Sequence, residues 1–111
     1  IVTNQSGIAL NYYTHEELAF VHNILLAELR KAGIFVLEIF YSPHHPSISA
    51  SLSRKPGGLL LEKAIAKYNI DANLSYMLGD RERDVEAAQA AGVKGILIES
   101  NSSLLALTNT I

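Results

Sequence analysis

The chain has 111 residues, a formal net charge of −2 and no cysteine. Its length fits one domain or a large part of one, and the apolar content of 49% indicates a folded core rather than disorder. The slightly negative net charge argues against a nucleic-acid partner. The lack of cysteine excludes disulfides and thiolate metal sites and fits a reducing compartment, so we expect a cytoplasmic protein. The strongest apolar run, residues 34–41, is too short to span a bilayer, and we expect no membrane partner.

The first half of the chain predicts a strand, a helix and a second strand. Residues 1–3 fit the end of a strand, and the sequence THEE predicts a capping box with Thr14 as N-cap and Glu17 at N3. Gly33 is expected to end this helix as its C-cap residue. Residues 34–41 then predict a buried strand. The helix has apolar residues at helical spacing: Leu18, Val21, Leu25 and Leu29.

The second half predicts a helix, a strand, another helix and another strand. Residues 75–78 read as a short strand, residues 82–91 as a helix closed by Gly92, and residues 95–98 as a last strand. The tail, residues 101–111, fits a last helical turn or a frayed end, and the sequence leaves both open. The helix that comes first in this half is predicted from the helical spacing of its apolar residues: Leu60, Leu61, Ala64, Ile65 and Tyr68.

This alternation predicts an α/β domain with a mostly parallel sheet. Sheets of this kind bind ligands at the carboxyl ends of their strands. Three segments follow predicted strands: residues 3–7, the stretch after Tyr41, and residues 79–84. We expect all three to lie on one edge of the sheet.

The first of these loops, TNQSG, offers two hydroxyls, two amides and a glycine that lets the backbone approach a ligand closely. Such small donors suit phosphate oxygens. The alternative is an ordinary turn or helix cap, because the same residue types favour turns.

The third loop, GDRERD, places Asp80 directly after a strand and Asp84 one helical turn later. Two carboxylates so placed can serve one Mg²⁺ ion together with water and a substrate phosphate. The alternative is that both acids stabilise a helix N-terminus, with Arg81 and Arg83 as solvated partners.

The middle stretch, YSPHHPSISASLSRKP, ends in Arg54 and Lys55. Lys55 is a point charge suited to a transferring phosphoryl group, and Arg54 can hold a second anion with two hydrogen bonds. Both also fit ordinary surface charges. The adjacent His44 and His45 raise the possibility of a metal site, although loop histidines that are hydrogen-bonded or near substrate are the simpler interpretation.

The order Thr-Asn, then Lys-Pro, then Gly-Asp-x-x-x-Asp resembles motifs two to four of the haloacid dehalogenase-like (HAD) phosphatases. The resemblance is closest to the branch of D-glycero-D-manno-heptose 1,7-bisphosphate phosphatases and histidinol-phosphatases. It is carried by VTNQSGIA, YSPHHP, SRKP, YMLGDRERDVEAA and AGVKGILI, which together cover nearly the whole chain. The resemblance implies a Rossmann-like three-layer sandwich and a Mg²⁺-dependent phosphomonoesterase that works through an aspartyl-phosphate.

The resemblance also implies roles for individual residues. Thr3 would hold the transferring phosphoryl group, and Lys55 would neutralise charge around it; these two are the catalytic candidates. Asp80 would coordinate Mg²⁺, with Asp84 supporting the metal site directly or indirectly. The remaining substrate-binding candidates are Asn4, Gln5, Ser6, Arg54 and Arg81.

The catalytic Asp-x-Asp motif of the family is absent, and no Asp precedes Asp71. In the family, the strand that carries this motif lies at the centre of the sheet, between the strands that here end at Thr3 and Leu78. Without that strand two half-sheets would have unpaired inner edges. We therefore expect residues 1–111 to be part of a longer phosphatase, truncated at the N-terminus, and not to catalyse alone.

Many members of this branch carry a zinc loop with Cys-Pro-His and Cys-x-Cys. The corresponding cysteine positions are Ser42, Ser51 and Ser53 here, and only His44 remains of the set. A neutral hydroxyl is a poor Zn²⁺ ligand, so we expect no zinc. The short loops also leave little room for a large cap domain.

Two classes of function follow from the resemblance. The first is a phosphatase acting on a sugar bisphosphate, with the heptose 7-phosphatase step first and histidinol phosphate as the alternative substrate. The second is a non-catalytic phosphate-binding remnant. The oligomeric state and the anomer of the substrate are not predictable from the sequence.

Overall fold

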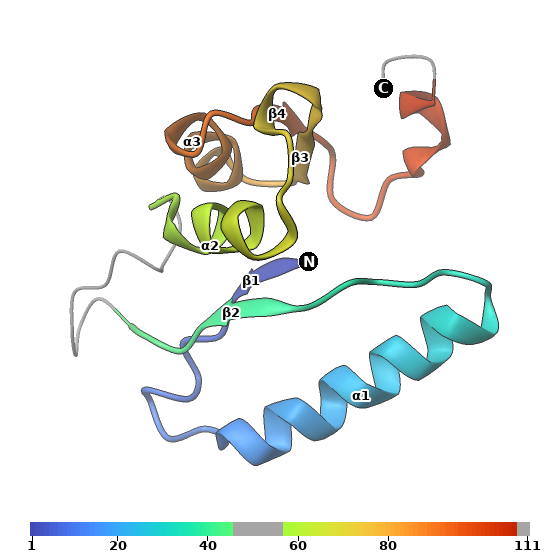
Figure 1. The fold of residues 1–111 in the computed structure, drawn as a ribbon. Coiled ribbons are helices and arrows are strands. Elements are labelled where there is room, and N and C mark those ends of the chain that lie inside the picture. The colour runs from blue at the N-terminus through green and yellow to red at the C-terminus, as the bar shows by residue number, and fades with distance from the viewer. Residues whose placement is uncertain (46–56, 109–111) are drawn as a thin grey trace. The chain divides into compact units, whose positions relative to one another are not determined.

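The computed structural model describes residues 1–45 and 57–108, and the chain divides into two compact units, Ile1–Arg54 and Lys55–Ile111 (Figure 1). Both units contain parallel strands joined through a helix, as expected for an α/β protein. Among the described residues, no helix is long and apolar enough to cross a membrane.

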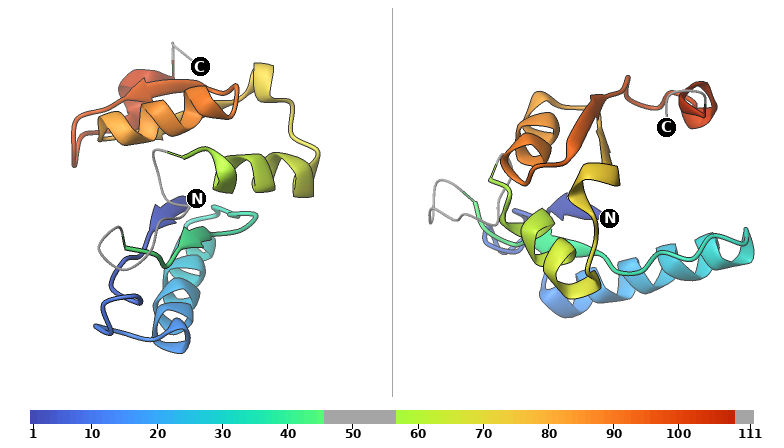
Figure 2. Two further views of the ribbon diagram at one scale, coloured as in Figure 1. Left: turned by 90° about the vertical axis from the view of Figure 1, so that its left-hand side faces the viewer. Right: turned by 45° about the horizontal axis from the view of Figure 1, so that its top comes forward.

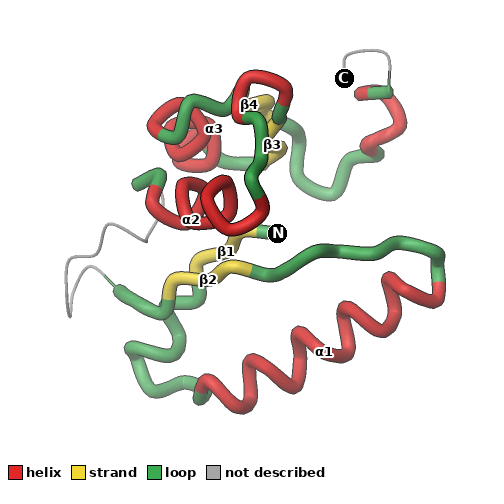
Figure 3. The backbone as a smooth tube through the Cα atoms, in the orientation of Figure 1, coloured by secondary structure: helices red, strands yellow, loops and turns green. Residues whose placement is uncertain are grey.

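In the first unit, strand β1 (Val2–Asn4) pairs in parallel with strand β2 (Phe40–Ser42). Val2 lies opposite Phe40, and Asn4 lies opposite Ser42. Helix α1 (His15–Lys31) makes the connection between the two strands, and it runs beside them within this unit (Figure 3). The predicted strand–helix–strand order of this half is confirmed.

The two ends of α1 follow from local sequence. The backbone N–H of Glu17 donates to Thr14 Oγ1 at 3.1 Å, and the backbone N–H of Thr14 donates to Glu17 Oε1 at 3.2 Å. The predicted capping box is therefore confirmed. At the other end Ala32 is the C-cap, and Gly33 follows it with φ +79°, a conformation that glycine adopts without steric cost. Gly33 therefore follows the C-cap, and the C-cap itself lies one residue earlier than predicted.

The predicted strand over residues 34–41 is wrong for most of its length. Only residues from Phe40 onward are in β2, and Phe35 and Leu37 are each 75% exposed. Strands need a partner, and the three residues of β1 pair with Phe40–Ser42. Residues 34–39 have no strand beside them in the described part of the chain, so Ile34, Phe35 and Leu37 remain exposed and Val36 and Ile39 are only half-buried.

Over residues 57–108, the second unit contains two parallel strands, two helices and two short 3-10 helices. Strands β3 (Tyr76–Gly79) and β4 (Lys94–Leu97) pair with Tyr76 opposite Lys94 and Gly79 opposite Leu97. These bounds agree with the predicted strands to within one residue at each end. The helices are α2 (Leu59–Tyr68), α3 (Glu82–Ala90), η1 (Ala72–Leu74) and η2 (Leu104–Leu107).

The predicted helices of this unit are confirmed, and η2 shows that the tail forms a short helical turn. The bend around η1 was not predicted. It is held by Asp71, whose Oδ1 accepts the backbone N–H of Asn73 at 3.0 Å. Gly92 has φ +75° after the C-cap Ala91, so it ends α3 as expected.

Helix α3 lies directly against the β3–β4 pair (Figure 2). Ala87 and Ala88 on its inner side are completely buried. A Cβ on Gly95 would stand 3.0 Å from Val85 Cα, so the helix backbone approaches β4 as closely as a glycine permits. This close packing fixes the start of α3 relative to the end of β3, where the predicted acidic loop lies.

Candidate functional site

The loop after β1 and the end of β2 meet at one edge of their two-stranded sheet. The strands are parallel, so both carboxyl ends point the same way, and the backbone N–H of Gln5 donates to the carbonyl oxygen of Ser42 at 2.8 Å. Asn4 and Ser6 are half-buried in this loop. The prediction that these two segments lie together is confirmed as far as Ser42. Arg54 and Lys55 lie outside the described residues.

A chain of hydrogen bonds runs from Tyr13 through Gln5 to Thr3. Tyr13 Oη donates to Gln5 Oε1 at 2.5 Å, and Gln5 Nε2 donates to Thr3 Oγ1 at 3.1 Å. The Thr3 hydroxyl points its own hydrogen toward the Asn4 carbonyl at 3.3 Å, which is a long contact. Both ends of the Gln5 amide are thus used within the loop, which the sequence did not predict.

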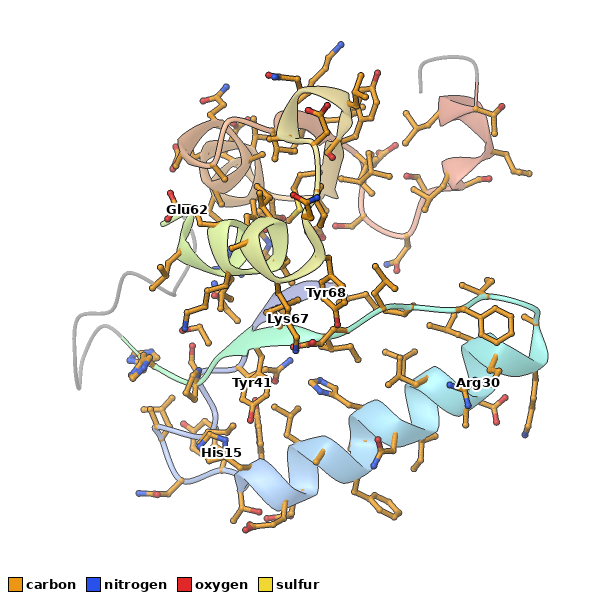
Figure 4. The ribbon with its side chains drawn as sticks, viewed as in Figure 1. His15, Arg30, Tyr41, Glu62, Lys67 and Tyr68 are labelled. Atoms are coloured by element: carbon orange, nitrogen blue, oxygen red, sulfur yellow. The ribbon has the colours of Figure 1, made fainter. Side chains whose placement is uncertain are left out.

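Two histidines of α1 flank Tyr41 at the end of β2. His15 Nδ1 is 2.8 Å from Tyr41 Oη, and the His22 ring meets the Tyr41 ring edge-on at a centroid distance of 5.9 Å. Figure 4 shows His15 and Tyr41 pointing toward one another. These contacts hold the start of α1 against β2 directly before His44 and His45. In the described ranges no three His, Cys, Asp or Glu side chains are grouped as a metal would require.

The β3–α3 turn brings Asp80 and Asp84 to the carboxyl end of β3. Asp80 is exposed, whereas Asp84 is only 4% exposed, and its Oδ2 accepts the backbone N–H of Arg81 at 3.2 Å. A Cβ on Gly79 would stand 2.2 Å from Asp84 Cβ. Only glycine at position 79 therefore lets the Asp84 side chain lie against the strand end, while Arg81 remains exposed at the N-cap.

Ser100 is a residue of this site that the sequence interpretation missed. Its Oγ donates to Asp80 Oδ2 at 2.5 Å, across twenty residues of chain. The backbone N–H of Ile98 donates to the Gly79 carbonyl at 2.9 Å and carries the β3–β4 ladder beyond Leu97. The rule that ligands bind after parallel strands applies to β4 as well, so it could have identified Ser100.

The donor set of this turn suits a hard divalent cation. Asp80 offers an exposed carboxylate whose orientation is fixed by Ser100, and Asp84 supplies a second negative charge from a buried position. Oxygen ligands and few protein contacts are what Mg²⁺ prefers. The residues at the end of β3 therefore fit a magnesium ion.

Replacing Ser100 by alanine should weaken metal binding in the full-length protein. Hydrogen bonds that orient a metal-ligating carboxylate typically contribute 10–100-fold to metal affinity, and we expect Ser100→Ala to raise the Mg²⁺ dissociation constant about 10-fold. Isothermal titration with Mg²⁺ measures it. Ser102→Ala is the matched control, because Ser102 Oγ bonds only the Glu99 carbonyl among the contacts described. Equal affinity in S100A and wild type would contradict this role.

A family model described as HAD-hydrolase-like matches residues 52–109, which is just over half of the chain. The chain belongs to the HAD-hydrolase-like family. The matched residues include the whole β3–α3–β4 arrangement that carries Asp80, Asp84 and Ser100.

Curated relatives of this HAD-family chain are named as heptose bisphosphate phosphatases. The D-glycero-alpha-D-manno-heptose-1,7-bisphosphate 7-phosphatase of Photorhabdus laumondii is 36% identical over 99 residues, covering 84% of this chain and 54% of the relative. The D-glycero-beta-D-manno-heptose-1,7-bisphosphate 7-phosphatase of Rhodopseudomonas palustris is 35% identical over 106 residues, covering 89% and 58%. The chain spans a little over half the length of these relatives.

Solved structures of HAD phosphatases share this fold. The D,D-heptose 1,7-bisphosphate phosphatase from B. bronchiseptica, crystallised with magnesium and phosphate, superimposes with a TM-score of 0.81 at 31% identity, covering 86% of this chain and 53% of that one. A HAD-like phosphatase from Mesorhizobium loti gives a TM-score of 0.82 at 32% identity, covering 92% and 53%. The predicted HAD-like α/β fold is confirmed.

Proposed function

We propose that the protein is a Mg²⁺-dependent phosphomonoester hydrolase that acts on a sugar bisphosphate, as a D-glycero-D-manno-heptose 1,7-bisphosphate 7-phosphatase. The observation that carries this proposal is the similarity to relatives of that name, 36% identical over 84% of the chain in the first case. The geometry of the Gly79–Asp84 turn supports it, since the turn offers carboxylates at the carboxyl end of a parallel strand.

The phosphate-binding part of the proposed site is built from neutral donors and two cations. Thr3 would donate its hydroxyl to the transferring phosphoryl group, with Asn4 and Ser6 beside it in the same loop. Lys55 would neutralise the charge that develops there, and Arg54 would hold the second anionic group of the substrate. Both cations follow from the sequence resemblance.

The metal-binding part of the proposed site is the β3–α3 turn. Asp80 would ligate Mg²⁺ directly, and the buried Asp84 would support the site from one turn further along α3. Arg81, exposed at the N-cap, would contact substrate. The bound cation would neutralise phosphoryl oxygens and help to align the phosphoryl group for attack.

The proposed reaction has two steps. A carboxylate oxygen attacks phosphorus while a neighbouring carboxylic acid protonates the leaving sugar oxygen. The carboxylate so formed then takes a proton from the water that cleaves the aspartyl-phosphate, which restores the nucleophile and releases inorganic phosphate. This proposal assigns the nucleophile to an Asp-x-Asp motif that the 111 residues do not contain, so residues 1–111 form part of a HAD-like phosphatase domain. The edge of β1 away from β2 is where the family pattern would add a strand.

The test is phosphate release by the full-length protein with heptose 1,7-bisphosphate as substrate. We expect release that depends on Mg²⁺, stops after one phosphate per substrate molecule and is abolished by EDTA. The alpha and beta anomers are assayed separately, because the relatives are named for different anomers. Preference for histidinol phosphate would replace the heptose assignment, and no Mg²⁺-dependent release from any phosphomonoester would indicate a phosphate-binding remnant.

The partner that this proposal requires is a small phosphorylated sugar. Neither a nucleic-acid nor a membrane partner is included, since the net charge is −2. We place the reaction in the cytoplasm, which agrees with a chain that contains no cysteine.

A further inference from the structure

We infer that Tyr13 is a positioning residue for phosphoryl transfer, and that it acts through Gln5 on the hydroxyl of Thr3. The inference rests on the proposed function, in which Thr3 holds the phosphoryl group. It assigns a role to Tyr13, and it gives Gln5 a role different from direct substrate contact. The evidence is the hydrogen-bond chain from Tyr13 Oη to Gln5 and from Gln5 to Thr3 Oγ1.

Tyr13 is held in place by its neighbours on both sides. It directly precedes Thr14, whose two capping bonds with Glu17 fix the start of α1. Its ring lies on the backbone of Gly7, where a Cβ would stand 2.2 Å from Tyr13 Cε1. The turn between them is closed by the Tyr12 N–H, which donates to the Gly7 carbonyl at 2.8 Å. The Tyr13 hydroxyl is therefore a fixed donor rather than a mobile surface group.

Gln5 is fixed at its backbone as well as at its side chain. Its N–H donates to the Ser42 carbonyl at 2.8 Å, and this bond ties the loop to the end of β2. Tyr13 Oη is 2.5 Å from Gln5 Oε1, and Gln5 Nε2 is 3.1 Å from Thr3 Oγ1. Both bonds are partly buried, so water competes for them less than at an exposed site.

The direction of the chain decides what Thr3 can do. A hydroxyl has one hydrogen to donate, whereas an amide nitrogen only donates and an amide oxygen only accepts. When Gln5 Nε2 faces Thr3, the Thr3 oxygen accepts. Its single hydrogen, which reaches the Asn4 carbonyl only over a long 3.3 Å contact, can then turn to a phosphoryl oxygen. When the amide is reversed, Thr3 must donate that hydrogen to Gln5 instead.

An anion beside Thr3 decides the direction of the Gln5 amide, and the Tyr13 hydroxyl supplies the donor that this direction requires. The anion takes the Thr3 hydrogen, so Gln5 must present its nitrogen to Thr3 and its oxygen to Tyr13, which donates to it. Without that donor, Gln5 Oε1 would be half-buried and unsatisfied in the phosphate-bound state, so phosphate binding would bear that cost. Loss of one hydroxyl, two residues removed from the phosphate, would thereby weaken phosphate binding at Thr3.

The central test is Tyr13→Phe in the full-length protein, compared with Tyr12→Phe. Phenylalanine keeps the ring on Gly7 and removes only the donor. We expect kcat to fall about 10-fold, as for the loss of one well-placed hydrogen bond, with a modestly lowered thermal midpoint and a protein that is still folded. Tyr12 is 78% exposed, and its change to Phe should alter neither quantity.

A double-mutant cycle separates this role from a general structural one. In a Thr3→Val background the hydroxyl that Tyr13 orients is gone, so adding Tyr13→Phe should lower the residual kcat no further. An additional 10-fold loss in that background would overturn the inference, because Tyr13 would then act independently of Thr3. A wild-type kcat in Y13F would overturn it equally.

Binding of inorganic phosphate distinguishes failure of this inference from failure of the proposed function. In the presence of Mg²⁺, Tyr13→Phe should weaken binding of inorganic phosphate about 10-fold by isothermal titration, whatever the turnover. A wild-type protein that binds phosphate but hydrolyses nothing would overturn the proposed function and leave the Tyr13 comparison intact. A wild-type protein that neither binds phosphate nor hydrolyses a phosphomonoester would overturn both the proposed function and this inference. If wild type and Y13F differed in turnover but bound phosphate equally well, the role of Tyr13 in phosphate binding would be overturned.

Discussion

Asp80→Asn in the full-length protein is expected to lower Mg²⁺-dependent phosphate release by at least about 100-fold. The proposed metal ligand loses its charge while its shape is kept, and metal stabilisation of phosphoryl transfer is worth several kcal/mol, with each 1.36 kcal/mol equal to a factor of ten. Steady-state phosphate release at saturating substrate measures the loss, and Mg²⁺ titration by calorimetry shows whether binding is lost with it.

Asp71→Asn is the matched control for Asp80→Asn. Asp71 is exposed in the same unit, and its Oδ1 accepts one backbone N–H at the start of η1, a bond that the Asn oxygen can also accept. Turnover should stay at the wild-type level. If D80N retained wild-type turnover at all Mg²⁺ concentrations, Asp80 could not be the metal ligand.

Gly79→Ala is expected to disrupt both stability and the metal site. The new methyl group would stand 2.2 Å from Asp84 Cβ and 2.5 Å from Asp84 Cγ, so the β3–α3 turn would have to open. Forced overpacking of this kind costs about 1–3 kcal/mol of unfolding free energy, and we expect the upper end of that range. Chemical denaturation measures the cost. Mg²⁺ affinity should fall as well, because Asp80 and Asp84 move apart.

Gly92→Ala controls for the general effect of adding a methyl group to this unit. A Cβ at Gly92 meets nothing within 4 Å, and its φ of +75° is the only source of strain. We expect a loss of about 1–2 kcal/mol in unfolding free energy with unchanged Mg²⁺ affinity. Weaker Mg²⁺ binding in G92A than in G79A would show that the steric argument for Gly79 is wrong.

The features that the sequence predicts well are those decided by neighbours in the chain. The capping box of Thr14 and Glu17 and the helix-ending glycines Gly33 and Gly92 depend on a few adjacent residues. The apolar spacing of α1 and α2 is likewise read over ten or so positions. These elements are found where the sequence predicts them, to within a residue or two.

The features that the sequence does not predict depend on a partner far along the chain. Residues 34–39 have the composition of a strand, but pairing with β1 begins at Phe40. The bond from Ser100 to Asp80 is set by the register of β3 and β4. The burial of Asp84 to 4% exposure follows from the missing side chain of Gly79, which the sequence shows only as a glycine beside an acid.

The site was predicted residue by residue, but its internal connections were not. Thr3, Asp80 and Asp84 were identified from motifs, and the assignment of their roles remains a proposal. The amide of Gln5 was expected to face substrate, whereas the structure uses both of its ends inside the loop, toward Thr3 and Tyr13. A motif fixes which groups are present, while hydrogen-bond direction depends on contacts that only the folded chain provides.

Substitutions that enlarge a side chain have almost no room beneath α3. Ala87 and Ala88 are fully buried, and the helix backbone at Val85 Cα would stand only 3.0 Å from a Cβ on Gly95. Larger side chains in α3 should therefore be tolerated only on the outer side of the helix, at exposed residues such as Glu86 and Gln89. The loop after β1 has one such limit at Gly7, where a Cβ would stand 2.2 Å from Tyr13 Cε1, whereas Tyr12 in the same loop is 78% exposed. Relatives with different substrate preferences should therefore differ at exposed loop positions such as Tyr12, while the turn bearing the acids keeps one length.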